Sequence, residues 1–208
     1  MNIKSFSLVV AANLLGWSLG NASVTGVTDW NYSGEIYCYS PLWDSTGNIG
    51  IDGYQSGPGQ MEGTITTSDP VDPTLTIANT IDNDSAFAWT GYIVNVSMNT
   101  GFTILSAAAT APPGWTANIT QPGAPVGGIY TGTIDYLGGT PVAIAPAVNS
   151  ELDFTYQVSF SGATSYNLTE SVTPVPEPGT FGLLTLGVLL LSGRAMARHR
   201  PGKPRAEA

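Results

Sequence analysis

Short segments in which apolar and polar residues alternate recur from Ser23 to Thr173, and they limit the fold more than any other feature. The clearest segment, Leu152–Phe160, places five apolar residues at every second position. Successive side chains of a β-strand point to opposite faces, so this spacing predicts a strand with one buried and one solvated face. No apolar stripe at helical spacing interrupts the pattern. We therefore expect an all-β body.

Clusters of Gly and Pro separate the alternating segments. Residues 86–98 form a second long strand candidate, in which Gly91 is expected to mark a bulge. Strands at 64–67 and 74–78 flank a loop that contains prolines, which cannot donate to a ladder. Further strands are expected at 34–39, 102–106, 115–120, 129–137, 142–145 and 165–169. About eight to ten short strands indicate an antiparallel β-sandwich, with a barrel as the alternative.

The charged residues are distributed very unevenly. Six Lys and Arg oppose fifteen Asp and Glu, which gives a formal net charge of −9. No Lys or Arg lies between Asn21 and Gly193, so the body must fold without a Lys or Arg ion pair of its own. It also lacks the basic surface that neutralises phosphates, and nucleic acid is therefore not expected as a partner.

Two residues that occur only once restrict the chemistry of the body. The only histidine, His199, lies near the C-terminus, so a Ser-His-Asp site, a Cys-His site or a tetrahedral zinc site in the body is excluded. The only cysteine, Cys38, alternates with Ile36 and is expected to be buried. No glycine-rich phosphate loop with its lysine occurs. The sequence therefore predicts no cofactor and no enzyme activity.

Paired carboxyls remain open as an alternative, because two acids about 5 to 10 Å apart can hydrolyse glycosides. The candidates are Glu35, Glu62, Glu151 and Glu170. The competing interpretation is that these are solvated acids on the polar faces of strands. Sequence spacing alone does not show that any pair converges.

Oxygen-rich turns and clustered aromatic residues are the other candidates. The segment Ile81-Asp82-Asn83-Asp84-Ser85 offers oxygen atoms to calcium, or else forms a turn that satisfies its own backbone. Asp69 and Asp72 allow the same two interpretations. Aromatic residues on a β surface would stack on sugar rings, whereas buried ones would fill the core; they include Trp30, Trp43, Trp89, Trp115, Tyr32, Tyr37, Tyr39 and Tyr54.

The first 22 residues have the features of a secretory signal peptide. Lys4 precedes an apolar run from Phe6 to Leu19, and the small residues Gly20 and Ala22 flank the expected cleavage position. We therefore expect export, with a body at 23–173.

Residues 174–208 consist of three consecutive parts. The tripeptide Pro176-Glu177-Pro178 is followed by an uncharged, mostly apolar stretch at about 180–193 and then by five basic residues. A helix of this length spans about 21 Å, short of the roughly 30 Å of a bilayer core. Basic residues on one side only nevertheless favour a short transmembrane helix with the body outside the cytoplasm. A buried core helix is the alternative.

The three parts together resemble the sorting signal of PEP-CTERM proteins, which Gram-negative bacteria export and which exosortases are thought to process. The resemblance implies that the stretch at about 180–193 is a transient anchor in the inner membrane. It also implies a recognition element at Pro176, Glu177 and Pro178, and a membrane stop signal at Arg194, Arg198 and Arg200 in the basic tail, 194–208.

From these features we expect an exported protein of the cell surface or extracellular matrix, with a structural or adhesive role such as that of biofilm proteins. The expected partners are an exosortase-type sorting enzyme, the inner membrane during sorting, and exopolysaccharide. A carbohydrate-active enzyme and a calcium-dependent carbohydrate-binding module remain the alternatives.

Overall fold

One strongly curved sheet forms the body of the protein. The computed structural model describes residues 23–69, 74–160 and 162–177, and these residues form ten strands and no helix. The expectation of an all-β body is therefore confirmed. The predicted signal peptide, transmembrane helix and basic tail lie outside the described residues. Within the described ranges, no helix is long and apolar enough to cross a membrane.

Most of the strands are ten or more residues long. In chain order they are β1 (Val24–Cys38), β2 (Leu42–Trp43), β3 (Asn48–Thr67), β4 (Thr74–Asn83), β5 (Trp89–Met98), β6 (Phe102–Ala111), β7 (Thr116–Thr120), β8 (Tyr130–Val142), β9 (Glu151–Phe160) and β10 (Ser165–Pro176).

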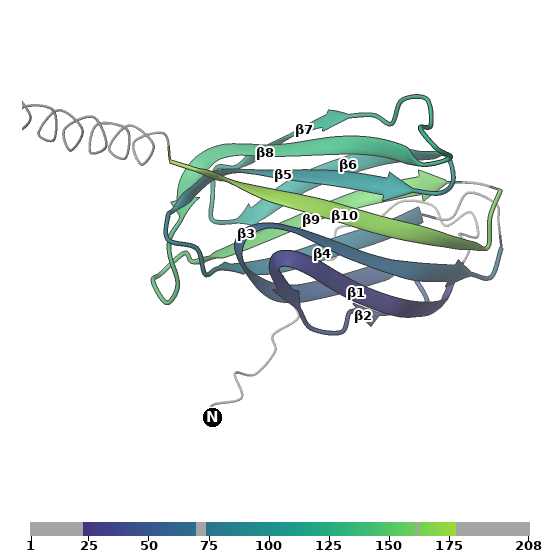
Figure 1. The fold of residues 1–208 in the computed structure, drawn as a ribbon, viewed down its shortest axis with the longest axis horizontal. Helices are drawn as coiled ribbons and strands as arrows, with labels where there is room; N and C mark the ends of the chain where they lie inside the picture. The colour runs from purple at the N-terminus through teal and green to yellow at the C-terminus, as the bar shows by residue number, and fades with distance from the viewer. Residues whose placement is uncertain (1–22, 70–73, 161, 178–208) are drawn as a thin grey trace, which may run out of the picture.

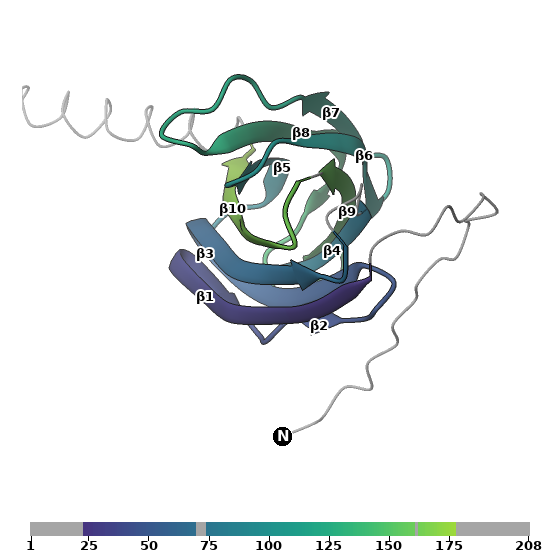
Figure 2. The same ribbon diagram turned by 90° about the vertical axis from the view of Figure 1, so that its right-hand side faces the viewer.

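Eight of the strands follow one path through the sheet, in the order β6-β9-β4-β3-β10-β5-β8-β7. Seen end-on, this path curls until β6 and β7 approach each other, while β1 and β2 lie outside β3 (Figure 2). The result is a nearly closed, barrel-like sheet rather than the predicted two-sheet sandwich. All pairings are antiparallel except that of β3 with β4.

The sheet curls because the long, curved strand β3 pairs with a different neighbour along each half of its length (Figure 1). Its first part, residues 48–55, pairs with β4, and residues 59–66 pair with β10. Two glycines allow β1 to lie against this strand. A Cβ at Gly53 would collide with the Tyr37 carbonyl, and one at Gly59 would collide with the Ile36 side chain.

The alternation in the sequence matches the burial of the strands. In β9 the apolar residues at every second position, from Leu152 to Phe160, are all buried. In β5 the buried set includes Tyr92, Val94, Val96 and Met98, and the β5–β8 register shifts at Gly91, as the predicted bulge requires. Cys38 is buried as well, and burial raises the pKa of its thiol to about 12.

A side chain closes the seam between β6 and β7, which no ladder of the described residues joins. The backbone N–H of Ile104 in β6 donates to Gln121 Oε1 at 2.9 Å, and Gln121 Nε2 donates back to the Ile104 carbonyl at 2.7 Å. The amide group thus replaces the two bonds that a neighbouring strand would supply. Because Ile104 is only 2% exposed, water cannot easily take over this role.

We expect Gln121→Met, which keeps the length of the side chain and removes both bonds, to lower the free energy of unfolding by about 1 to 3 kcal/mol. Urea denaturation measures the change. The matched control is Gln60→Met, because the Gln60 amide only donates to Glu62 Oε2 on the surface, and it should cost less than about 0.5 kcal/mol. Equal losses in the two variants would show that the seam does not depend on Gln121.

Candidate functional site

The predicted recognition element begins inside the sheet. Strand β10 continues through Pro176, and it pairs with β5 at Val175↔Gly91 and Pro176↔Trp89. The predicted boundary of the body at residue 173 therefore falls within β10 rather than after it.

Two hydrogen bonds tie the end of β10 to the start of β5. Thr90 Oγ1 donates to the Pro176 carbonyl at 3.3 Å, and the Glu177 N–H donates to the Ala88 carbonyl at 3.2 Å. Two of the three predicted recognition residues thus contact the folded body. The third, Pro178, and the predicted stop-signal residues Arg194, Arg198 and Arg200 lie outside the described residues.

Four tyrosines form one surface cluster, the tyrosine patch, which consists of Tyr32 and Tyr37 of β1, Tyr39 just after β1, and Tyr54 of β3. Tyr37 is half-buried and the other three are exposed. The Tyr37 ring lies at its centre, with ring centroids 4.9 Å from Tyr32, 5.5 Å from Tyr39 and 4.9 Å from Tyr54. Tyr37 and Tyr54 are partners in the β1–β3 register and their rings stack at 16°. The patch faces outward because the neighbouring residues Ile36 and Cys38 fill the inner face of β1.

Exposure separates this patch from the other aromatic residues. Tyr39 is 54% exposed and Tyr54 is 40% exposed, whereas Trp89 and Trp115 are buried in the core. Trp43 of β2, 43% exposed, lies in a strand that also pairs with β3. The early cluster of aromatic residues in the sequence is therefore mainly a surface feature.

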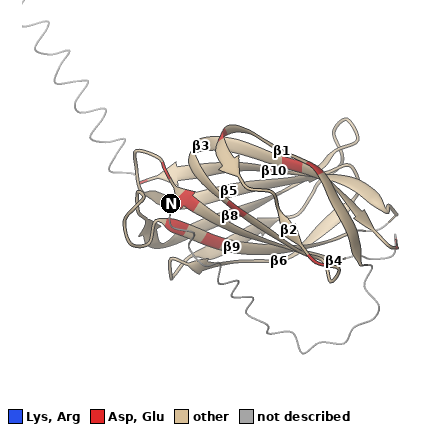
Figure 3. Ribbon diagram, turned by 90° about the horizontal axis from the view of Figure 1, so that it is seen from below, with Lys and Arg blue, Asp and Glu red and all other residues tan. Residues whose placement is uncertain are grey.

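An acidic face adjoins the tyrosine patch on the outer side of β3, β4 and β9, and Figure 3 marks in red the Asp and Glu positions on β9 and the strands beside it. Asp82 of β4 pairs with Tyr54 of β3 on one side and with Glu151 of β9 on the other. Burial raises the pKa of Asp52, and the carboxyls of Asp82 and Asp153 raise it further. None of the described residues is Lys or Arg, so this face carries negative charge only.

The four candidate glutamates do not gather at one place. Glu35, Glu62 and Glu151 are exposed, as the interpretation as solvated acids predicts. That interpretation is wrong for Glu170, which is 0% exposed. Glu62 pairs with Thr169, the residue before Glu170, so the two carboxyls lie on opposite faces of the same wall.

The structure instead brings Glu151 together with Asp82. The two residues are direct partners in the β4–β9 register and line an open pocket of about 380 Å³. Loops around Pro112 and Pro146 form its other side. Partners in an antiparallel pair have Cβ atoms about 4.5 to 5.5 Å apart, which is close enough for two carboxyls to act on one glycosidic bond. Sequence reasoning missed this pair because it depends on the register.

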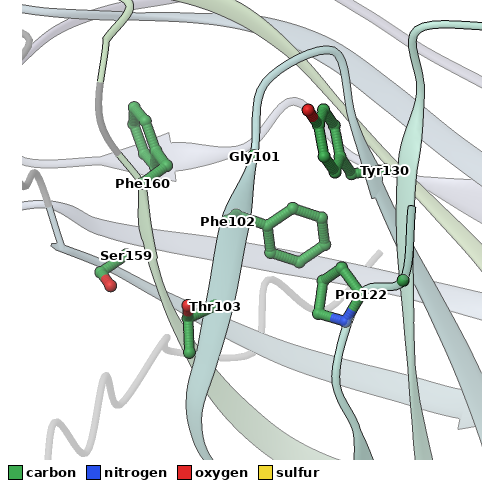
Figure 4. Close-up of a pocket in the computed structure, with 8 residues that line it drawn as sticks. Gly101, Phe102, Thr103, Pro122, Tyr130, Ser159 and Phe160 are labelled. Carbon is green, nitrogen blue, oxygen red and sulfur yellow. The ribbon is translucent and has the colours of Figure 1, made fainter. Parts of the chain in front are cut away.

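A pocket of about 370 Å³ lies at the opposite end of the β6–β9 pair. Figure 4 shows the rings of Phe102, Tyr130 and Pro122 beside one another, with Thr103 and Ser159 on the other side. Gly101, Gly123 and Phe160 complete the lining, which contains no ionisable acid or base besides the Tyr130 phenol. The pocket therefore offers an apolar surface and hydroxyl groups, but no carboxyl for acid–base chemistry.

The oxygen-rich segment 81–85 forms a turn that satisfies its own backbone. Asn83 Oδ1 accepts from the Ser85 N–H at 2.9 Å and from Ser85 Oγ at 2.6 Å. Its Nδ2 donates to the carbonyls of Phe87 and Val142. These contacts favour the Asx-turn interpretation over a calcium loop. The described part of the chain contains no group of three or more His, Cys, Asp or Glu that could hold a metal ion.

Glu170 is a carboxyl enclosed by the barrel-like sheet. Asn79 Nδ2 donates to its Oε2 at 3.3 Å, while Oε1 and the Tyr156 hydroxyl have no hydrogen-bond partner among the described residues. Burial raises the pKa of Glu170 to about 7, although the nearby Tyr156 hydroxyl and Asn79 amide lower it. The hydroxyls of Tyr92 and Tyr136 and the Cys38 thiol also lie within electrostatic range. No cation of the body compensates its charge, so the folded state favours the protonated form.

A family model for the PEP-CTERM protein-sorting motif matches residues 174–200. The match includes the predicted recognition element and the predicted stop-signal arginines, and it begins within β10. No curated protein and no solved structure matches the chain.

We expect the protein to lose stability as the pH rises from about 4.5 to about 7, because the pKa of Glu170 is higher in the folded state than its ordinary value of 4.5. The stabilisation from the protonated carboxyl is complete below the unfolded-state pKa of 4.5 and is lost above the folded-state pKa of about 7. It amounts to about 3 kcal/mol. Glu170→Gln should remove this part of the pH dependence.

Urea denaturation at a series of pH values gives the free energy of unfolding of the parent and of Glu170→Gln. The difference between the two free energies at each pH measures this effect. Glu62→Gln, at an exposed glutamate, is the matched control and should leave the profile almost unchanged. Parallel profiles for the parent and Glu170→Gln would contradict the assignment.

Proposed function

We propose that the body of this chain, which carries a PEP-CTERM protein-sorting motif at residues 174–200, has a non-catalytic, adhesive role and binds exopolysaccharide of the surface or matrix. The motif implies export and exosortase sorting to the cell surface. The tyrosine patch is the observation that carries this proposal. The partners are the sorting enzyme, the inner membrane during sorting and the polysaccharide afterwards.

The physical properties of the patch suit a sugar ligand. Contiguous exposed aromatic surface commonly marks an interaction site. Tyrosine rings supply large, rigid contact areas at low cost in conformational entropy, and their hydroxyls remain available for hydrogen bonds. The contacts of Tyr37 with three neighbouring rings restrict the movement of the patch before any ligand arrives. A sugar ring, which has an apolar face and a polar rim, complements such a surface.

The acidic face beside the patch narrows the class of polysaccharide. Carboxyl oxygens such as those of Asp52 and Asp153 accept hydrogen bonds, and bonds to an ionised acceptor are roughly twice as strong as neutral ones. Sugar hydroxyls and amino groups provide matching donors. Because every charged side chain of the described body is negative, a polyanion would be repelled. The proposed ligand is therefore a neutral or amino polysaccharide.

One observation favours a second candidate function, that of a carbohydrate-active enzyme. Asp82 and Glu151 are paired at an open pocket, and two carboxyls are sufficient for glycoside hydrolysis. A calcium-dependent binding module has less support, because the amide of Asn83 is already engaged in its turn.

We expect Tyr54→Ala and Tyr39→Ala each to weaken binding of a neutral or amino polysaccharide about five-fold, since one lost ring contact corresponds to about 1 kcal/mol. Tyr39→Phe keeps the ring and should bind nearly as well as the parent. Leu105→Ala, at a 51% exposed residue of β6, is the control for an unrelated surface change. Affinity electrophoresis in gels that contain neutral, amino or acidic polysaccharides measures the effect. Unchanged mobility of both alanine variants in every gel would refute the role of the patch.

The enzyme alternative is tested by assaying release of reducing sugar from the same polysaccharides. We expect none from the parent protein. If the parent hydrolyses a polysaccharide, and Glu151→Gln abolishes this activity while Glu62→Gln preserves it, the protein is an enzyme with its site at the pocket of Asp82 and Glu151. The adhesive role would then be wrong. Glu62 is a suitable control because its carboxyl lies on β3, away from that pocket.

A further inference from the structure

The last residues of β10 are paired on one side only. The β10–β3 ladder ends at Val172↔Gly59, whereas the β10–β5 ladder continues to Pro176↔Trp89. Among the strands that the structure describes, β5 is therefore the only one that pairs with β10 from Thr173 onward. This terminal part of the strand, residues 173–177, is called the β10 end segment below.

Its amino-acid sequence limits pairing along the other edge. Backbone groups of a strand alternate between its two edges, and the Val172 carbonyl faces β3, where it accepts from Gln55 Nε2. Pro174 faces this same edge and has no N–H to donate there. Thr90 Oγ1 and the Glu177 N–H add two bonds to the β5 ladder, at 3.3 Å and 3.2 Å. Pro174 is buried, but Val175, Pro176 and Glu177 are half-buried. The end segment thus has fewer contacts than the rest of β10, and ends of strands with few contacts open most readily.

Residues 174–177 of the end segment belong to the sorting motif, which begins at residue 174. An enzyme that reads a short peptide needs access to its backbone groups and side chains, and extended peptides are often bound by strand pairing. In the folded body, β5 occupies one edge of the end segment, and the Val175 side chain lies against Gly91. The other edge has no strand partner among the described residues, but Pro174 offers no N–H there to pair with an incoming strand. The edge that can both donate and accept is held by β5, so the enzyme and β5 compete for it.

We propose that the sorting enzyme takes up Pro176 and Glu177 only after the β10 end segment has separated from β5, so that this strand exchange limits sorting. The recognition surface is then the released edge of residues 173–177, and the partner is an enzyme that binds this segment with Pro176 and Glu177. The inference depends on the sorting motif and not on polysaccharide binding, so the two are tested separately.

A disulfide between β5 and the end segment tests the need for separation. A Cβ at Gly91 would lie 3.2 Å from Val175 Cβ and 3.3 Å from Leu137 Cδ2, and disulfides join Cβ atoms about 3.8 Å apart. Gly91→Cys with Val175→Cys therefore forms the staple after small shifts. Asn95→Cys with Ser171→Cys is the matched control, because these residues pair in the same ladder before the motif. Cys38 is buried and should not interfere.

The experiment follows processing of the full chain, as loss of a C-terminal epitope, in a host that contains the sorting enzyme. In an oxidising periplasm the staple should slow processing at least ten-fold relative to the control staple, and in a strain without the periplasmic disulfide oxidase the same variant should recover. Processing of the oxidised staple at the rate of the control staple would overturn the proposal.

A second variant keeps the test decisive if the cysteines themselves impair folding or recognition. Thr90→Ala lies outside the motif and removes the bond to the Pro176 carbonyl. It should speed processing about two- to five-fold, which corresponds to the loss of one hydrogen bond. Thr103→Ala, on β6, is the control and should leave the rate unchanged. An unchanged rate for Thr90→Ala would show that separation from β5 does not limit sorting.

Discussion

The structure depends on satisfying its polar groups without any cationic side chain. Between Asn21 and Gly193 every charged side chain is a carboxylate, so no ion pair with Lys or Arg can compensate a buried group or join two strands. Neutral amides take over this role at the places where the sheet bends or ends. Amides can donate and accept at the same time, which makes each of them a substitute for a missing backbone pair.

Three amide side chains illustrate this. Gln121 closes the seam of the barrel-like sheet at β6. Asn83 holds the turn after β4 and reaches the end of β8. Gln55, at the bend of β3, donates to the Gly57 carbonyl at 2.6 Å and accepts from the Tyr92 hydroxyl. A single amide does not compensate a buried carboxylate. Asn79 donates one hydrogen bond to Glu170, and burial still raises the pKa of that carboxyl.

The sequence predicts local features of this protein well and its closure poorly. Alternation of apolar and polar residues identified β9 and the buried face of β5. It also indicates that the Glu170 carboxyl is buried, because Glu170 occupies the same set of alternate positions as Tyr166, Leu168 and Val172. Tyr37 and Tyr39 alternate with residues of the core and so could be placed outside. The stacking of Tyr54 on Tyr37 and the pairing of Asp82 with Glu151 depend on register, which no local pattern specifies. Closure by Gln121 depends on one side chain of a loop.

The neighbours of β10 determine how a tethered molecule would carry mechanical load. A pull on the C-terminal side enters through β10, and a ligand on the tyrosine patch pulls on β1 and β3. The β10–β3 ladder ends at Val172↔Gly59, and Tyr54 of the patch lies just beyond Gly59 on β3. Both pulls therefore reach this ladder at the same end and load its hydrogen bonds one after another, beginning at Val172↔Gly59. Because β5 pairs with β10 as far as Pro176, it shares the load that enters from the C-terminal side.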